Sequence, residues 1–296
     1  MALSIFTNAS SMASTNALNK SNSLLSTSME RLGTGKRINS AADDAAGMQI
    51  ASRLQGQTNG MTVAKRNIAD ATSMLQTAEG AFDEVSNIMY RMKDLATQAA
   101  NDTNSSEDRA SLQSEFDQLN SELGNIMSNT SYGGTKLLSG TTGLASTGGL
   151  NFQIGSSNAE TLNVNVSSQL SGLTKTIGTA ATTNPSGATV PGTGLGALKL
   201  DSATNASGAI ASLESALKDV GSLRSTLGAN INRLGHTSAN LANMQDNTEL
   251  ALGNIRDADF ASEASTMTRQ QMLAQTSMSM LKQSNSMSGM VMSLLG

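Results

Sequence analysis

A seven-residue repeat of apolar side chains runs for 50 residues and limits the chain to a few folds. Steps of four and three residues from Ile50 land on apolar positions, and only Gln57 is polar. The other positions are Leu54, Met61, Ala64, Ile68, Ala71, Leu75, Ala78, Phe82, Val85, Met89, Met92, Ala96 and Ala99. Such a repeat is typical of long, nearly parallel helices that supercoil gently. At about 1.5 Å per residue, it predicts a helix of roughly 75 Å.

Two further segments carry the same spacing. The polar run NDTNSS ends the first helix, and Ser105 with Asp108 forms a possible capping box for the next one. That helix places Leu112, Phe116, Leu119, Leu123 and Ile126 in the same rhythm. A later stretch repeats it through Ile210, Leu213, Leu217, Val220, Leu227, Ile231, Leu234, Leu241, Leu252 and Ile255, with Arg224, Ser238, Gln245 and Thr248 as polar members. We expect a mainly α fold, in which these helices form an elongated antiparallel bundle.

The middle of the chain breaks the helical pattern. Both prolines, Pro185 and Pro191, lie there, and glycine and threonine cluster from about residue 139 to 196. Because proline interrupts helices, this zone is expected to be irregular. Within it, apolar residues alternate on either side of a polar turn, which predicts a small β-hairpin with one buried face. The alternating residues are Leu150, Phe152, Ile154, Leu162, Val164 and Val166.

The two ends carry more apolar surface than one helix pair can bury. Beyond Phe260, one seam follows Ala264, Met267, Ala274, Met278, Leu281, Met292 and Leu295, and a second follows Leu273, Met280, Met287 and Leu294. The amino end adds Leu18, Leu25 and Leu32. Each buried leucine or methionine contributes about 1.5 to 3 kcal/mol, and soluble monomers rarely expose large apolar patches. We therefore expect both ends to become ordered in an assembly.

Composition excludes several classes of function. The net charge is -4 and the pI is about 5.1, so a nucleic-acid partner is not expected. The chain has no cysteine and one histidine, His236, which rules out thiolate chemistry and a two-histidine zinc site. It has no apolar run of 18 residues and no leader of the secretory type, so we expect no membrane span, and any export by another route. We expect neither an enzyme nor a cofactor.

Several separated motifs, in order, resemble those of the bacterial flagellins. The amino-terminal signature is SMERLGTGKRINSAADDAAGMQIASRLQGQ, and the carboxy-terminal one begins NIRDADFASEASTMTRQQMLAQ. Between them, RMKDLATQAANDTNSSEDRASLQSEF and TSYGGTKLL also match the pattern. The resemblance covers residues 1 to 138 and about 205 to 296. It indicates a short flagellin with little or no outer variable domain.

This resemblance implies a structural subunit that polymerises into the flagellar filament outside the cell. The implied domains are an inner-tube helix at 1–43, rod helices with the hairpin at 44–170, a variable loop region at 171–203, a rod helix at 204–255 and an inner-tube helix at 256–296. The implied partners are further copies of itself, an export chaperone, the filament cap and the hook-junction proteins. A hook-filament junction protein or a coiled-coil component of type III secretion is the alternative. A polymer seam is expected through Leu18, Leu25, Leu32, Leu273, Met280, Met287 and Leu294.

The charge cluster in the first signature allows several interpretations. GTGKR resembles a phosphate loop, but Glu30 stands where the pattern needs glycine and Arg37 where it needs Ser or Thr. Adjacent Asp43 and Asp44 could be an acid-base pair, yet first-turn helix caps explain them more simply. Our hypothesis is that ion pairs form within or between subunits where the first helix passes into the rod. The residues concerned are Arg31, Lys36, Arg37, Asp43 and Asp44.

Three other features have alternative explanations. DADFASE resembles the start of a calcium loop, but Ser262 replaces the required glycine, so a turn and helix cap is favoured. The carboxy-terminal methionines could form a membrane-active helix, yet basic residues are sparse there and helix packing is favoured. By resemblance to flagellins sensed by the animal innate immune receptor, Arg91, Leu95 and Glu115, with Gln98, are candidate receptor contacts on an exposed face. Tyr90 stands where many recognised members have glutamine.

Overall fold

The computed structural model describes residues 9–139, 143–177, 182–183, 189–190 and 194–295. The chain divides into two compact units. One consists of residues 1–58 and 246–296, and the other of residues 59–245. Pro185 and Pro191 lie outside the described residues, as do the side chains of Met292, Leu294 and Leu295.

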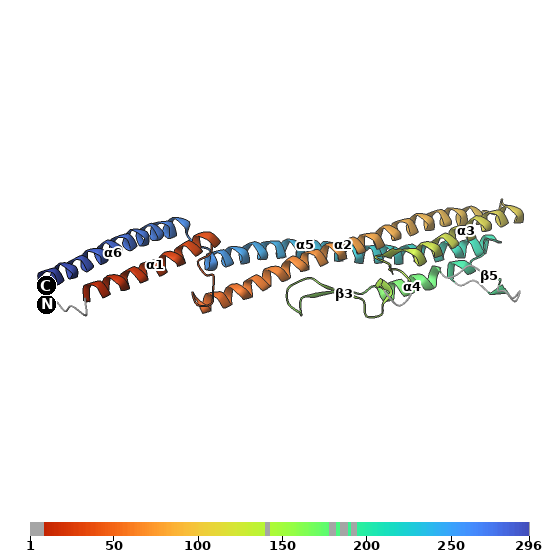
Figure 1. The fold of residues 1–296 in the computed structure, drawn as a ribbon. Helices are drawn as coiled ribbons and strands as arrows, with labels where there is room; N and C mark the ends of the chain where they lie inside the picture. Colours follow the sequence, from red (N-terminus) through yellow and green to blue (C-terminus); the bar gives the residue numbers. More distant parts are fainter. Residues whose placement is uncertain (1–8, 140–142, 178–181, 184–188, 191–193, 296) are drawn as a thin grey trace. The chain divides into compact units, whose positions relative to one another are not determined.

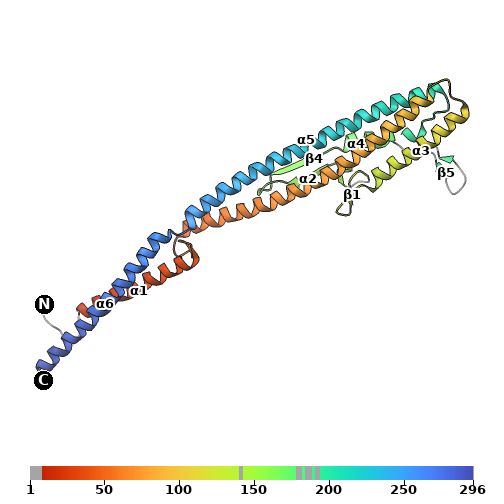
Figure 2. The same ribbon diagram turned by 90° about the horizontal axis from the view of Figure 1, so that it is seen from above.

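Three helices form the frame of the 59–245 unit, hereafter the rod unit. Helix α2 (Ala45–Ala99) and helix α5 (Ala203–Arg256) lie side by side, and α3 (Ser106–Asn129) turns back along them (Figures 1 and 2). The prediction of long, uninterrupted helices is confirmed by α2 and α5. The capping box at the start of α3 is confirmed, because Ser105 and Asp108 exchange both side-chain-to-backbone hydrogen bonds.

From Met61 onward, the predicted seam of α2 lies in the core of the rod unit, whereas its predicted first member, Ile50, is 41% exposed. From Met61 to Ala99, every member of the register is at most 3% exposed. The α5 seam meets it through Leu213, Val220, Leu227, Leu234 and Leu241, all buried. The buried side chains are mainly aliphatic and of small or medium size. The helices therefore pack closely, with the side chains of one helix fitting between those of the next.

Each long helix also buries a second stripe that the first register does not contain. On α2, Ile88 and Leu95 are buried and lie seven residues apart. On α5, the second stripe consists of Ala209, Ala216, Leu223 and Asn230. A helix that packs between two neighbours needs two apolar faces, whereas a two-helix seam needs one. The third layer, of α3 and the segments beyond it, accounts for these extra buried positions.

Small strands and a short helix cover the rod helices. Strand β3 (Leu150–Gln153) pairs antiparallel with β4 (Thr161–Val164), which confirms the predicted hairpin. Leu162, Val164 and Val166 are buried on its inner face. A second hairpin joins β1 (Ser131–Tyr132) to β2 (Thr135–Lys136) through Gly133 and Gly134, which both have the positive φ that a tight hairpin turn requires. A third two-stranded pair is β5 (Thr182–Thr183) with β6 (Thr189–Val190).

The sequence did not predict α4 (Ser167–Ile177), because its first residues follow a strand pattern and its last ones were taken for variable loop. Leu170 and Leu173 are buried and anchor α4 to the core. The short η1 (Gly143–Ala145) and η2 (Gly194–Ala197) flank this region and bury Leu144 and Leu195. Gly194 has φ +59, and a Cβ there would meet the backbone oxygen of Thr176, so the chain returns against the end of α4.

Polar side chains connect these layers. Arg224 on α5 donates to Glu79 Oε1 of α2 at 2.7 and 3.1 Å, and its Nη1 lies 2.9 Å from Asp83 Oδ1. The hydrogen bond to Glu79 is the main reason why the pKa of Arg224 is raised above its ordinary value. On α3, Gln113 accepts from Leu200 N at 2.7 Å and so holds the segment that leads into α5. These contacts fix where the heptads face one another.

In the other unit, hereafter the terminal unit, α1 (Ala9–Thr34) runs antiparallel to α6 (Phe260–Leu295) (Figure 1). Ser10 bonds to Ser284 at 2.9 Å near one end, and Arg31 lies 3.8 Å from Glu263 at the other. The side chains buried between the two helices are small, namely Ser21, Ser28 and Ala274. No described helix in either unit is both long and apolar enough to cross a membrane.

Candidate functional sites

The loop between α1 and α2 holds the predicted charge cluster. It begins at Gly35, whose φ of +71 suits glycine. Lys36 then forms an antiparallel β-bridge with Asp257, in the turn between α5 and α6. Arg37 N donates to Arg256 O at 2.7 Å, and Ala258 N donates to Gly35 O at 3.0 Å. Two turns that are distant in the sequence are thus joined by backbone hydrogen bonds.

These two turns, residues 35–44 and 257–259, are hereafter called the junction, and each charged side chain in it has a defined position. Arg37 Nη2 donates to Ile255 O at 2.9 Å, which places a positive charge at the carboxyl end of α5, where the helix dipole favours it. Asp44 Oδ1 accepts from Gly47 N at 2.9 Å and caps the start of α2, as predicted. Among the described residues, Arg31 is the one member of the cluster with a salt bridge, to Glu263. Ion pairing of the others between subunits stays a prediction.

Asp43 holds the loop in shape rather than pairing with a cation. Its Oδ2 accepts from Ser40 N at 2.9 Å, from Asn39 N at 3.1 Å and from Ser40 Oγ at 3.1 Å. These hydrogen bonds, the one from Ser40 N foremost, lower the pKa of the carboxyl below its ordinary value of 3.8. The adjacent aspartates therefore have separate structural roles, and the geometry offers no acid-base pair.

The second turn of the junction belongs to the DADFASE stretch. Asp259 Oδ1 accepts from Ala261 N at 3.0 Å, and Asp259 O accepts from Glu263 N at 2.9 Å. This arrangement confirms the predicted turn and cap between α5 and α6.

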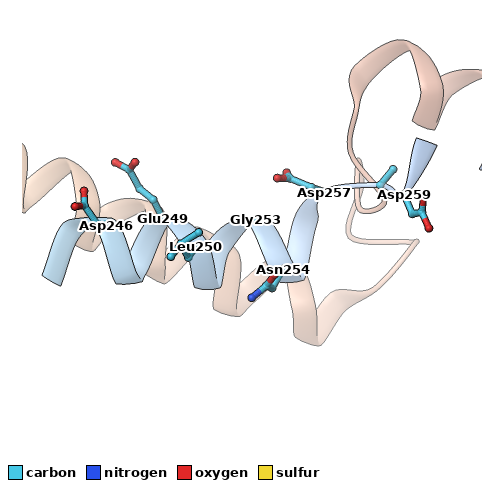
Figure 3. A pocket seen from close by; sticks show the side chains of 8 residues that line it. Asp246, Glu249, Leu250, Gly253, Asn254, Asp257 and Asp259 are labelled. Atoms are coloured by element: carbon cyan, nitrogen blue, oxygen red, sulfur yellow. The ribbon is translucent and has the colours of Figure 1, made fainter. Parts of the chain in front are cut away.

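An open hollow of about 730 Å³ lies along the end of α5 (Figure 3). Its lining residues are Asp246, Glu249, Leu250, Gly253, Asn254, Asp257, Ala258 and Asp259. In Figure 3 the carboxylates of Asp246 and Glu249 lie on one side of α5, while Asn254 points to another. Neither these carboxylates nor any other described residues form a group of three that could hold a metal ion.

The terminal helices expose a large apolar surface. Leu273, Met280 and Met287, spaced by seven, are 46%, 61% and 50% exposed. Leu18, Leu25 and Leu32 are half-buried on α1. Phe260 and Met272 of α6 and Met12 and Met29 of α1 are exposed as well. Such surface is characteristic of an interaction site.

The predicted receptor residues fall on α2 and α3 of the rod unit. Arg91 and Glu115 are exposed and paired, with Arg91 Nη2 donating to Glu115 Oε1 at 2.7 Å. Gln98 is exposed too. The prediction of an exposed Leu95 was wrong, since only 2% of it is accessible. Leu95 belongs to the second buried stripe of α2, which the single-seam register did not include.

Comparisons with known proteins agree on one family. Residues 5–143 match the sequence model of the bacterial flagellin N-terminal helical region, and residues 210–295 match that of the C-terminal helical region. The chain is 34% identical to polar flagellin F of Vibrio parahaemolyticus and to flagellin A of Vibrio cholerae, with 100% of both chains covered in each case. The alignments span 382 and 383 positions, so these relatives have longer sequences than this 296-residue chain.

One solved structure gives a fold-level likeness. A putative flagellar hook-associated protein from Vibrio parahaemolyticus superposes with a TM-score of 0.53 at 15% identity, over 73% of this chain and 100% of that one. At that identity the likeness concerns the fold alone.

Gly47 and Gly56 are expected to respond oppositely to alanine. A Cβ on Gly47 would meet Asp44 Oδ2 at 2.5 Å and Ile38 Cδ1 at 2.8 Å, whereas nothing lies within 4 Å of one on Gly56. Gly47→Ala should lower the stability of the junction by about 1 to 3 kcal/mol. Gly56→Ala should raise helix stability by about 0.5 to 1 kcal/mol. Thermal unfolding followed by circular dichroism measures both, and equal shifts for the two variants would contradict the assignment.

The Asp43 loop is expected to loosen in acid. Because its pKa is lower folded than unfolded, the carboxylate stabilises the loop fully above pH 3.8, and this contribution is lost as the pH falls through the lowered value. The Ser40 amide resonance should therefore titrate in NMR spectra recorded at decreasing pH. The same titration should be absent in Asp43→Asn. A pH-independent Ser40 resonance in the unaltered chain would refute the prediction.

Proposed function

The chain belongs to the bacterial flagellin family, and we propose that its polymerisation contacts are made by the apolar faces of α1 and α6. Flagellins are structural proteins rather than enzymes. They are exported and self-polymerise into the extracellular filament that drives motility, and this chain is such a subunit.

The observation that carries the proposal is the exposed stripe of Leu273, Met280 and Met287 on α6. The helix contains only three charged residues, Glu263, Arg269 and Lys282, and none of them belongs to this stripe. Its partner α1 covers a narrow seam made largely of serine and alanine. Further copies of the chain are the natural cover for the remaining faces, because each copy brings the same kind of surface.

We assign the ends to the inner tube and the remainder to the rod. The inner-tube segments would be residues 1–43 and 256–296, and the rod segments residues 44–170 and 204–255, with 171–203 as the variable region. The difference in packing supports a division into two domains, although the two compact units part at residues 58/59 and 245/246. The rod unit buries a continuous apolar core of its own, whereas the α1–α6 pair buries small side chains.

The same apolar surface of α1 and α6 is the expected contact for the other partners. An export chaperone would cover α6 before assembly, since an uncovered helix of this kind would associate prematurely. The cap and the hook-junction proteins would meet the terminal faces of the first and last copies. These assignments rest on the family resemblance together with the exposed residues of α6.

For the innate immune receptor, we propose a contact surface on the rod made of Arg91, Glu115 and Gln98. The Arg91–Glu115 pair is solvent-accessible, with 56% and 46% of its side chains exposed. Leu95 would support this surface from beneath by packing.

Replacing Leu273 tests the polymer surface. Leu273→Glu should slow the extension of filament seeds by about tenfold or more, because it places an unpaired charge in a face that becomes buried. Leu273→Met is the matched control and should extend seeds normally, since it keeps volume and polarity. Electron microscopy and light scattering measure elongation. Seed extension by Leu273→Glu at the normal rate would remove this face from the interface.

Replacing Arg91 tests the receptor surface. Monomeric protein should activate receptor-bearing cells, and Arg91→Ala should weaken that response because the variant removes a charged contact. Arg66→Ala removes another exposed arginine of α2 and should leave the response unchanged. If both variants unfold at the same temperature as the unaltered chain, a folding defect is excluded. Full signalling by Arg91→Ala would contradict the assignment.

A further inference from the structure

Several methionines of this chain differ sharply in exposure. The chain has 17 methionines and no cysteine. In the rod core, Met61, Met89 and Met92 are 0% exposed. On α6, by contrast, five methionines have about half or more of the side chain accessible, namely Met272, Met278, Met280, Met287 and Met290. The solvent-accessible thioethers of α6 therefore lie on the helix whose surface we assign to polymerisation.

We propose that these five α6 methionines are a reversible oxidation site that controls whether a free subunit can join the filament. The inference rests on the proposed role of the α6 face in polymerisation. It adds a chemical modification, its oxidant class and its consequence. Because the chain has no thiol, no cysteine competes for the oxidant.

The oxidant is a peroxide, and the reaction balances with one molecule of it per sulfur. The thioether sulfur attacks one peroxide oxygen, a sulfur–oxygen bond forms and the oxygen–oxygen bond breaks. The sulfur loses two electrons and becomes a sulfoxide, while the proton of the transferred oxygen passes to the leaving hydroxide and gives water. Methionine sulfoxide reductases reverse the change with a dithiol such as dithiothreitol as the electron donor, which becomes a disulfide as water is released.

The sulfoxide opposes burial for a direct physical reason. A methionine side chain fills an irregular apolar interface because it is flexible and uncharged. The sulfoxide carries a strong hydrogen-bond acceptor, which must lose its water when a neighbouring copy covers it. The stripe of Leu273, Met280 and Met287 is apolar, so a sulfoxide there replaces an apolar contact with a polar one.

Assembly into a filament should protect the α6 methionines from oxidation. A free subunit presents the five thioethers to solvent, whereas neighbouring copies would cover them in a filament. The oxidant should then modify free subunits and spare assembled ones. The buried Met61, Met89 and Met92 provide an internal reference, because they should stay reduced in both states as long as the rod unit is folded.

The test exposes purified monomers and preformed filaments to the same hydrogen peroxide concentration. Peptide mass spectrometry then locates the sulfoxides, and extension of untreated seeds measures assembly. We expect oxidation at the α6 methionines of monomers and a fall in seed extension of about tenfold or more, which corresponds to about 1.4 kcal/mol of lost binding per tenfold. Reductases of both stereospecificities should restore extension. Filaments should show little oxidation at these positions.

Two matched variants assign the effect to α6. In the variant with Met272→Leu, Met278→Leu, Met280→Leu, Met287→Leu and Met290→Leu, peroxide treatment should leave seed extension at the level that the same variant shows untreated. The variant with Met61→Leu, Met89→Leu and Met92→Leu should remain sensitive. If the first variant does not polymerise even untreated, reductase repair of the oxidised natural chain decides in its place, and failure of repair overturns the proposal.

The outcomes separate this inference from the function on which it depends. If untreated protein does not extend seeds, the proposed polymerisation face fails and the oxidation site fails with it. If untreated protein extends seeds and the α6-oxidised protein does so equally well, only the oxidation proposal is overturned. Oxidation of Met61, Met89 and Met92 to the same extent as the α6 methionines would also overturn it.

Discussion

Burial of seven-residue stripes is the constraint on which the rest of the molecule depends. In the rod unit, the stripes of α2 and α5 face each other, and the additional stripes on both helices are covered by the third layer. The terminal unit has the same kind of helix but too few partners. Ser21, Ser28 and Ala274 fill the α1–α6 seam, so most of the apolar side chains there remain outside it. One physical rule thus produces a self-sufficient unit and an incomplete one.

The sequence predicted well whatever depends on periodicity. The long helices, the break after Ala99, the cap at Ser105 and the β3–β4 hairpin were all readable, because each follows from a local pattern. The sequence did not predict where a third element packs against two helices. Leu95 lies off the first register, and a single seam gives no sign that a third helix will cover it. Likewise α4 is held by Leu170 and Leu173 in a segment whose local composition suggests a loop.

The junction illustrates the same limit for charged residues. The sequence marked Arg37, Asp43 and Asp44 as important, and the caps near them followed from helix geometry. It could not show that Arg37 would bind Ile255 O, because that partner is 218 residues away. Charges at such a turn are more useful as backbone partners than as ion pairs, since the ends of α2 and α5 present unpaired amides and carbonyls there.

The Arg224 clamp has a consequence for the spacing of the whole polymer. A heptad stripe is nearly self-similar, so a slip of seven residues, about 10 Å along the axis, would re-pair most apolar neighbours. Arg224, Glu79 and Asp83 do not recur at that interval, and a slipped pair would strand all three groups. The clamp therefore favours one register of α2 against α5. A regular filament requires copies of uniform length, because each copy makes the same contacts with its neighbours.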